Sequence, residues 1–132
     1  MQTLTATEFD KVNRAVNRET DYYCPPAADY KWESSDDLIG PTGRPRGMCA
    51  DQAIAKYERL ALIGQPRDAM RFAIVGVEKP GDHMILCAND GEKWWALDIR
   101  FPDLMAPSAL PYSWQCWGKD FEQGSWTTVD WS

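Results

Sequence analysis

The sequence predicts an α+β protein in which helices pack on an antiparallel sheet. Two helix-like segments with apolar residues at three- and four-residue intervals come first, at 4–19 and 49–63. Three apolar runs typical of strands follow, at 70–78, 82–88 and 92–99, and Asn-Asp-Gly joins the last two as in a hairpin. Because the predicted helices come first and the predicted hairpin follows them, the order of elements favours the α+β class.

Length and charge set the broad class. The chain has 132 residues, which suits a single domain over 1–132 with its own core. Its 14 basic and 20 acidic residues give a net charge of −6, which argues against a nucleic-acid partner. The N-terminus lacks the basic start and apolar stretch of a signal peptide, and no apolar run is long enough to span a membrane. We therefore expect a cytoplasmic monomer.

The first helix is predicted from its N-terminal signals. Thr5 and Glu8 have the spacing of a capping box, and Leu4 and Phe9 fit a hydrophobic staple around it. Prolines and weak periodicity predict loops at 21–32 and 40–47, with at most one helical turn at 34–41 between them.

The second helix is predicted to begin at Cys49 and to end near Ile63. Gly64 stands where a C-terminal cap is expected, and Pro66 follows it. The apolar stripe that predicts the helix consists of Ala50, Ala53, Ile54, Tyr57, Leu60 and Ala61. At the other end of the chain, the aromatic tail at 112–131 is expected to add one or two strands.

Four cysteines are spaced too irregularly for a zinc site, and a disulfide framework is not expected in a reducing compartment. We predict no metal and no cofactor, and we interpret Cys24, Cys87 and Cys116 as small buried hydrophobic residues. Cys49 differs because a helix N-terminus favours the thiolate, which is the nucleophilic form.

The single histidine, His83, can be paired with an acid from the hairpin register. If Asp90 and Gly91 form a two-residue turn, His83 lies directly opposite Asp98. A three-residue loop with a bulge would make the two residues diagonal neighbours, with contact still possible. Asp98 would then orient the ring and stabilise its protonated form, in an ion pair that we expect to be partly exposed.

The segments 12–19, 32–40, 47–66 and 81–100 resemble the bacterial transglutaminase-like cysteine proteinases. The resemblance runs from about Val12 to Phe101 and implies a papain-like, transglutaminase-like core with its catalytic helix packed on an antiparallel sheet. It implies that Cys49 is the nucleophile, His83 the base and Asp98 the orienting acid. It also aligns Trp32 with a family tryptophan whose indole could help to hold an oxyanion, although packing against the core is the alternative.

The sequence departs from the family at the cysteine. Acidic residues usually flank it, and in secreted members they help to hold calcium; here Met48 and Ala50 are the neighbours, and only Asp51 is acidic. A calcium site is therefore doubtful, and the chain looks like a cytosolic or phage-encoded relative. Trp94 shares a strand face with Asp98 and is expected to wall the active site.

The predicted function is cysteine peptidase activity on a peptide or isopeptide amide, through an acyl-enzyme on Cys49. Transfer of the acyl group to an amine, as in a transglutaminase, is an alternative. A second alternative is a non-catalytic binding or inhibitor protein that keeps the fold, which the changed cysteine flanks favour. The expected partner is a protein or peptide.

Overall fold

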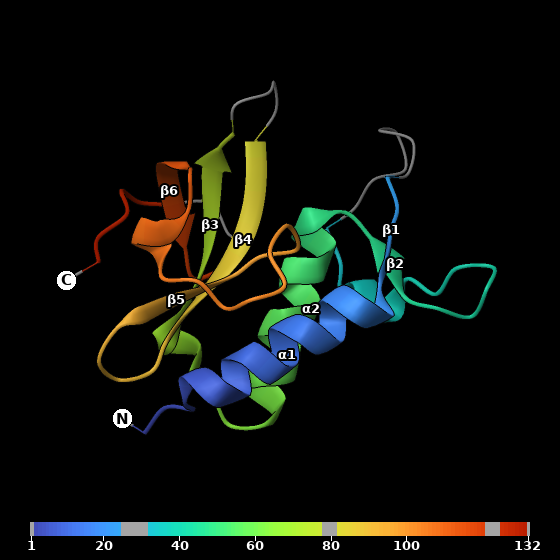
Figure 1. Ribbon diagram of the computed structural model, residues 1–132, viewed down its shortest axis with the longest axis horizontal. Helices are drawn as coiled ribbons and strands as arrows, with labels where there is room; N and C mark the ends of the chain where they lie inside the picture. Colours follow the sequence, from blue (N-terminus) through green and yellow to red (C-terminus); the bar gives the residue numbers. More distant parts are fainter. Residues whose placement is uncertain (1, 25–31, 78–81, 121–124, 132) are drawn as a thin grey trace.

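Two helices cover one face of a four-stranded antiparallel sheet (Figure 1). The computed structural model describes residues 2–24, 32–77, 82–120 and 125–131. Helix α1 spans Ala6–Glu19 and helix α2 spans Cys49–Leu62. The strands β3 (Met70–Gly76), β4 (Asp82–Asn89), β5 (Trp94–Leu97) and β6 (Ser113–Gly118) lie in the order β5-β4-β3-β6. Helix α2 packs on β4, and α1 packs on α2 and β5, so the α+β prediction is confirmed.

Helix α1 begins as its capping signals predict. The Thr5 backbone N–H donates to Glu8 Oε2 at 2.6 Å. This hydrogen bond satisfies an N–H group that has no acceptor within the helix. Phe9 and Val16 are fully buried on the inner face, and Leu4 packs against the same core. The helix is therefore held by its apolar face against α2 and the sheet.

Two short strands lie in segments for which loops were predicted. Strand β1 (Asp21–Tyr22) pairs in parallel with β2 (Arg46–Gly47), and the Tyr23 N–H donates to the Gly47 carbonyl at 3.1 Å. Two residues are too few to produce an alternating pattern, so the sequence gives no sign of them. The single predicted turn is present as a 3-10 helix at Ser35–Asp37, capped by Ser34 Oγ. The pairing of β1 with β2 anchors the chain just before Cys49.

Helix α2 is buried more completely than its apolar stripe suggests. Every residue from Ala50 to Lys56 is buried, including three polar ones, Asp51, Gln52 and Lys56. Gly64 ends the helix with φ +116°, a conformation that favours glycine, as its predicted role as cap requires. Residues 50–56 of α2 are thus almost completely removed from solvent.

The loop between β4 and β5 differs from the two-residue turn that was predicted. Asn89 pairs with Trp94 and Cys87 with Ala96, so four residues, 90–93, form the loop. The Asp90 carboxylate accepts the N–H groups of Glu92 and Lys93 and the Trp95 indole N–H, which stabilises the longer loop. The register moves by two residues, so each side chain stays on the face that was predicted.

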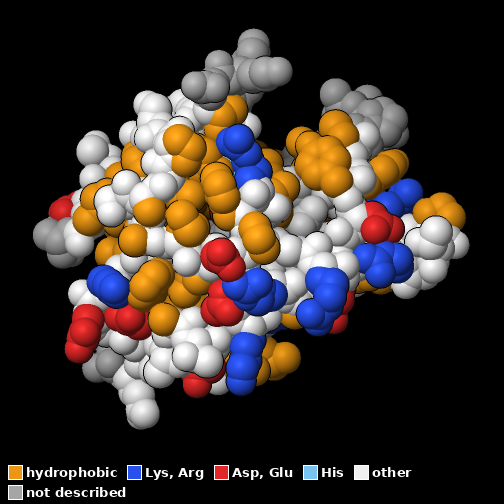
Figure 2. All heavy atoms as spheres, viewed as in Figure 1, with side chains coloured by type: hydrophobic (Ala, Val, Ile, Leu, Met, Phe, Trp, Pro, Cys, Tyr) orange, Lys and Arg blue, Asp and Glu red, His pale blue; other side chains and the backbone are white. Residues whose placement is uncertain are grey.

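The far face of the sheet carries a second core. It contains Ala73, Ile85, Cys87, Ala96, Leu110 and Trp117. The aromatic tail supplies β6 and one bridge between Trp117 and Thr127, as predicted. Figure 2 shows hydrophobic side chains over the sheet and mixed charges toward α1. Among the described residues, no helix has both the length and the apolar character that crossing a membrane requires.

All four cysteines are free, and their burial differs from the prediction in part. Cys87 is fully buried, as expected for a small hydrophobic residue. Cys24 is exposed and Cys116 is only half-buried, which corrects the prediction for both. Cys24 follows the edge pairing of β1 and belongs to neither of the two hydrophobic cores among the described residues.

Candidate active site

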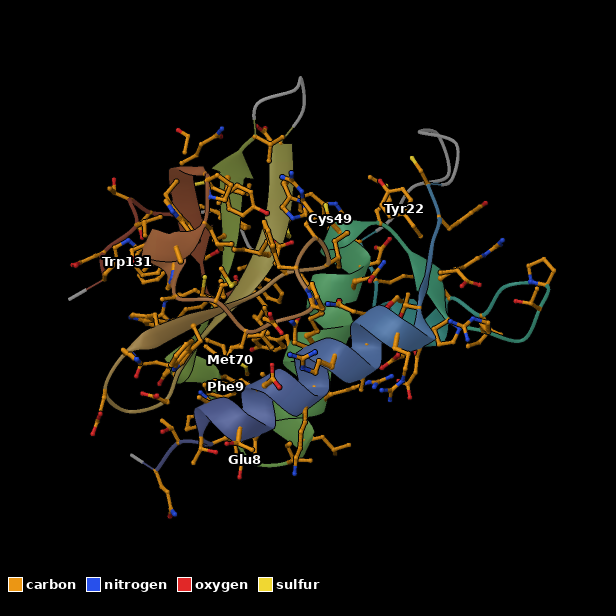
Figure 3. All side chains as sticks on the ribbon, in the orientation of Figure 1. Glu8, Phe9, Tyr22, Cys49, Met70 and Trp131 are labelled. Atoms are coloured by element: carbon orange, nitrogen blue, oxygen red, sulfur yellow. The ribbon has the colours of Figure 1, made fainter. Side chains whose placement is uncertain are left out.

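Cys49 is the first residue of α2, as its sequence position predicts. Asp51 fixes this helix start, because its Oδ2 accepts the Met48 N–H at 3.0 Å. Gln52 adds a second restraint by donating from Nε2 to the Gly47 carbonyl at 3.0 Å. Figure 3 shows Cys49 at the end of α2 beside β4, with Tyr22 of β1 across from it. The thiol therefore lies at a helix N-terminus held by side-chain hydrogen bonds, with β4 on one side and β1 on the other.

The surroundings of the Cys49 thiol favour its anionic form. Burial raises its pKa, but a hydrogen bond with His83, the backbone amides of Met84 and Ala50, and the charge of His83 lower the pKa further than burial raises it. The net effect is a pKa below the ordinary thiol value. A thiol in this position is poised to act as a nucleophile.

His83 lies between Cys49 and Asp98. Its Nε2 is 2.7 Å from Asp98 Oδ1, so Nδ1 is the ring nitrogen left to face the thiol. Burial lowers the imidazole pKa, but the hydrogen bonds with Asp98 and Cys49 and their negative charges raise it to about 9. The raised imidazole pKa and the lowered thiol pKa both favour a protonated His83 between two anionic partners.

Asp98 is held more firmly than a surface ion pair would be. It is 1% exposed and His83 is 8% exposed, which corrects the expectation of a partly exposed pair. Its Oδ1 also accepts the Arg100 N–H at 2.9 Å, and its Oδ2 accepts the Tyr112 hydroxyl. Burial raises the carboxyl pKa, but His83, Tyr112 and the Arg100 amide together lower it below the usual value. Asp98 therefore remains a carboxylate.

Tyr112 is a site residue that the sequence reasoning missed. It directly precedes β6, its hydroxyl donates to Asp98, and its ring lies 5.8 Å from the His83 ring in an edge-on arrangement. Burial and the hydrogen bond to Asp98 raise its pKa, so the hydroxyl keeps its proton as a donor. Its one sequence signal was its place at the start of the aromatic tail, and this says nothing about which residue it contacts.

A pocket of about 230 Å³ opens over the thiol. It is lined by Trp32, Met48, Cys49, Ala50, Ile74, Asp82, His83 and Met84. Trp32 is 50% exposed, so it faces the pocket and solvent and does not pack inside the core. The pocket walls are mostly apolar, with the Asp82 carboxylate as the acidic group among them.

Trp94 lies away from this pocket. Its ring is 4.8 Å from that of Trp117 in the aromatic cluster on the far face of the sheet. There it lines a different cavity, with Trp114 and Trp131. The longer loop between β4 and β5 places Trp94 opposite Asn89, at the end of the hairpin remote from His83. The expectation that Trp94 walls the site is therefore corrected.

Comparison with known proteins identifies a family for the whole chain. The profile of the bacterial transglutaminase-like cysteine proteinase family (BTLCP) matches residues 1–132. The chain belongs to this family. It is accordingly a cysteine protease-like hydrolase that acts on protein or peptide substrates. A search of curated proteins found no significant match.

Solved structures of LapG from Legionella pneumophila share the fold of this BTLCP protein. One is 24% identical with a TM-score of 0.73 and is matched over 97% of this chain and 71% of its own. The calcium-bound form is 25% identical with a TM-score of 0.72, over 96% of this chain and 72% of its own. The transglutaminase-like fold that the sequence predicts is therefore confirmed.

The calcium-bound relative raises the question whether this BTLCP chain could hold the same ion. Ca²⁺ takes six to eight oxygen ligands. Met48 and Ala50 supply no side-chain oxygen, and the two Asp51 oxygens accept backbone N–H groups of Met48 and Glu33. Within the described ranges, no group of three or more acidic, histidine or cysteine side chains could hold a metal. The residues at this helix start do not fit a calcium ion.

Proposed function

We propose that this protein is a cysteine peptidase that uses Cys49 as nucleophile, His83 as base and Asp98 as orienting acid. The observation that carries the proposal is the continuous chain of hydrogen bonds from the Cys49 thiol through His83 to the buried Asp98 carboxylate. Nucleophile, base and orienting group in mutual contact, with the nucleophile open to a pocket, are what acyl transfer requires.

The proposed reaction begins with the thiolate of Cys49 and the imidazolium of His83. The sulfur attacks the carbonyl carbon of the scissile amide, and we assign stabilisation of the resulting oxyanion to the Cys49 backbone N–H, because N–H groups at a helix start have no partner within the helix. His83 then gives its proton to the leaving amine, and an acyl-enzyme on Cys49 remains. Water then gives a proton to His83 and attacks the acyl carbon, and the Cys49 sulfur leaves as a thiolate. This step releases the acid product and restores the thiolate–imidazolium pair.

Trp32 is assigned a substrate-facing role in this proposal. It is half-exposed and lines the same pocket as Cys49, so its indole can contact a bound peptide or add a donor to the oxyanion. Trp32→Phe separates these two uses, because phenylalanine keeps the aromatic surface and loses the N–H. A fall in kcat with an unchanged KM identifies the donor role.

The test uses an activated acyl donor, because the natural substrate is not needed for it. With p-nitrophenyl acetate, we expect a burst of nitrophenolate equal in amount to the protein, followed by slow turnover. Cys49→Ala should remove the burst, and His83→Ala should slow it strongly. Cys116→Ala is the matched control, since it removes a half-buried thiol outside the pocket.

Two other outcomes have clear signatures. If an added alkyl amine captures the acyl group faster than water does, the protein is a transamidase that uses the same site. If Cys49 acylates no faster than the exposed Cys24, the proposal fails and a binding protein that keeps the fold is the better interpretation.

A further inference from the structure

Asp82 is an acidic residue in the wall of the pocket over Cys49, and the proposed mechanism gives it no role. Its neighbour His83 is the proposed base, but successive side chains of a strand point to opposite faces, so Asp82 is outside the chain of hydrogen bonds through His83. The apolar part of the pocket wall is formed mainly by Trp32, Met48, Ile74 and Met84. An apolar pocket with one charged group is typical of a site that selects its ligand by charge.

The strand register places Asp82 on the same face of the sheet as the apolar wall. Asp82 and Met84 are two residues apart on β4, and their partners on β3 are Gly76 and Ile74, so all four share one face. Figure 1 shows the C-terminal end of β3 and the N-terminal end of β4 extending past the start of α2. Asp82 is exposed, whereas Met84 is buried. The carboxylate therefore lies at the open end of the pocket, where a charged partner can keep part of its water.

Gln115 of β6 holds the Asp82 carboxylate from across β3. The register between β3 and β6 shifts between Ile74 and Val75 and leaves Gln115 without a paired residue on β3, as in a β-bulge. A bulge redirects the side chain of the extra residue. Gln115 Nε2 donates to Asp82 Oδ1 at 3.1 Å, and it passes so close to Gly76 that a Cβ there would lie 3.1 Å from this nitrogen. Asp82 is thus oriented by a neighbour, and its Oδ2 can accept from a ligand.

We infer that Asp82 is a specificity-determining residue, and that the pocket takes a lysine or arginine side chain from the residue that donates the scissile carbonyl. This inference rests on the proposed function. The acyl group stays bonded to the Cys49 sulfur, and this sulfur is itself part of the pocket, so we assign the pocket to the acyl side of the scissile bond.

A basic side chain matches both parts of the pocket. Lysine and arginine pack their aliphatic stems on apolar surface and keep the charged end near water, which here places the charge at Asp82. The half-exposed Trp32 offers an aromatic face to the same cation. The volume of about 230 Å³ is below the roughly 300–1,000 Å³ of pockets that enclose a whole small molecule, so it suits one side chain.

The same charges disfavour the other classes of side chain. An acidic side chain would meet the Asp82 carboxylate as a like charge. A purely apolar side chain would remove water from this carboxylate without giving it a donor. The net charge of −6 also attracts a cationic peptide over longer distances.

The test compares two acyl donors that differ only in a terminal ammonium group, the p-nitrophenyl esters of Nα-acetyl-lysine and Nα-acetyl-norleucine. The second-order rate constant for acylation of Cys49 is measured for each ester with the full chain, and the rate with Cys49→Ala is subtracted. We expect wild type to prefer the lysine ester. Asp82→Asn should lower the lysine-to-norleucine ratio about five- to thirtyfold, as for a charge-assisted hydrogen bond at a partly exposed site.

Use of the ratio removes any effect of Asp82→Asn on the neighbouring His83, because such an effect is common to both esters. Gln115→Ala, which frees the carboxylate without removing it, should lower the ratio by a smaller factor of about two to five. Asp68→Asn is the matched control, since it neutralises an exposed carboxylate that pairs with Lys119 outside the pocket. Its ratio should equal that of wild type.

A salt titration of wild type gives a measurement that needs no variant. The preference for the lysine ester should shrink in about 1 M sodium chloride, where the Debye length is about 3 Å. Equal rates for the two esters in wild type, or a ratio that Asp82→Asn leaves unchanged, would overturn the inference and leave the peptidase proposal intact. If neither ester acylates Cys49, the proposed function fails and the inference fails with it.

Discussion

His83 and Asp98 are in contact across a diagonal of the β4–β5 hairpin. The last pairs of the hairpin join Cys87 to Ala96 and Leu86 to Leu97. If this register is extended by one residue, Asp98 lies opposite Ile85, and His83 is two residues further along β4. The 2.7 Å contact nevertheless forms, because both side chains project from the same face and the chain leaves the strand after Leu97. The network around Asp98 makes the following expectations testable.

Asp98→Asn should reduce turnover and stability together. The amide keeps the shape but cannot stabilise the imidazolium of His83, so we expect a loss on the order of 10–10³ in kcat, less than the roughly 10⁴ seen in serine proteases. Because Asp98 is buried and accepts three hydrogen bonds, the free energy of unfolding should fall by about 1–3 kcal/mol. Acylation kinetics and thermal melting measure both effects. Full activity in a folded Asp98→Asn protein would exclude Asp98 from the mechanism.

Tyr112→Phe should have a smaller effect with a pH signature. Loss of one hydrogen bond of about 0.5–1.5 kcal/mol predicts a two- to tenfold slower acylation. Asp98 also becomes a stronger partner for the imidazolium, so the pKa of His83 should rise and the alkaline limb should move to higher pH. Tyr57→Phe is the control, since the Tyr57 hydroxyl contacts Arg67 on an exposed surface. An unchanged alkaline limb would show that Tyr112 has only a packing role.

The contribution of His83 to stability should decrease at alkaline pH. The pKa of His83 is raised from 6.5 to about 9 in the folded protein, so the folded state binds the proton more tightly than the unfolded chain. This stabilisation is fully present below pH 6.5 and is lost as pH rises through about 9. Thermal melting of wild type and His83→Gln should therefore differ most at pH 6 and least at pH 10. A difference that grows with pH would contradict this assignment.

Chelation should leave the protein folded and reactive. Asp51 uses its carboxylate to bind two backbone amides, and Met48 and Ala50 offer no oxygen ligand, so EGTA should change neither the melting temperature nor the rate of Cys49 alkylation. A melting temperature that rises with added calcium would show that the ion binds the folded state. Asp51→Ala should lower stability by about 0.5–2 kcal/mol with or without calcium, through the lost helix cap.

Replacing Lys56 should stabilise the protein at neutral and acid pH. The pKa of Lys56 is lowered from 10.5 to about 7 in the folded state, so the unfolded chain binds its proton more tightly and stability rises with pH across this interval. Lys56→Met lacks this cost. Its melting temperature should exceed that of wild type most clearly at pH 6, and the difference should shrink toward pH 10. A Lys56→Met protein that is less stable at pH 6 would mean that the ammonium has a favourable partner.

The sequence alone determined the elements that carry the site. The capping box at Thr5 and Glu8, the helix that starts at Cys49, the cap at Gly64 and the strand of His83 all depend on neighbouring residues, and all are present in the structure. Local signals also placed His83 and Asp98 on one face, because a shift of two residues in register preserves the alternation of side chains.

Only the tertiary structure decided which side chains meet. Tyr112, which precedes β6, donates to Asp98 across 14 positions of the chain. Lys56 is fully buried on α2 although its Nζ has no hydrogen-bond partner among the described residues. The position of Trp94, the pairing of β1 with β2 and the depth of Asp98 likewise depend on how the layers pack. Such contacts leave no periodic pattern in the chain, because they arise from the free energy of burying whole surfaces and not from the preference of any one segment.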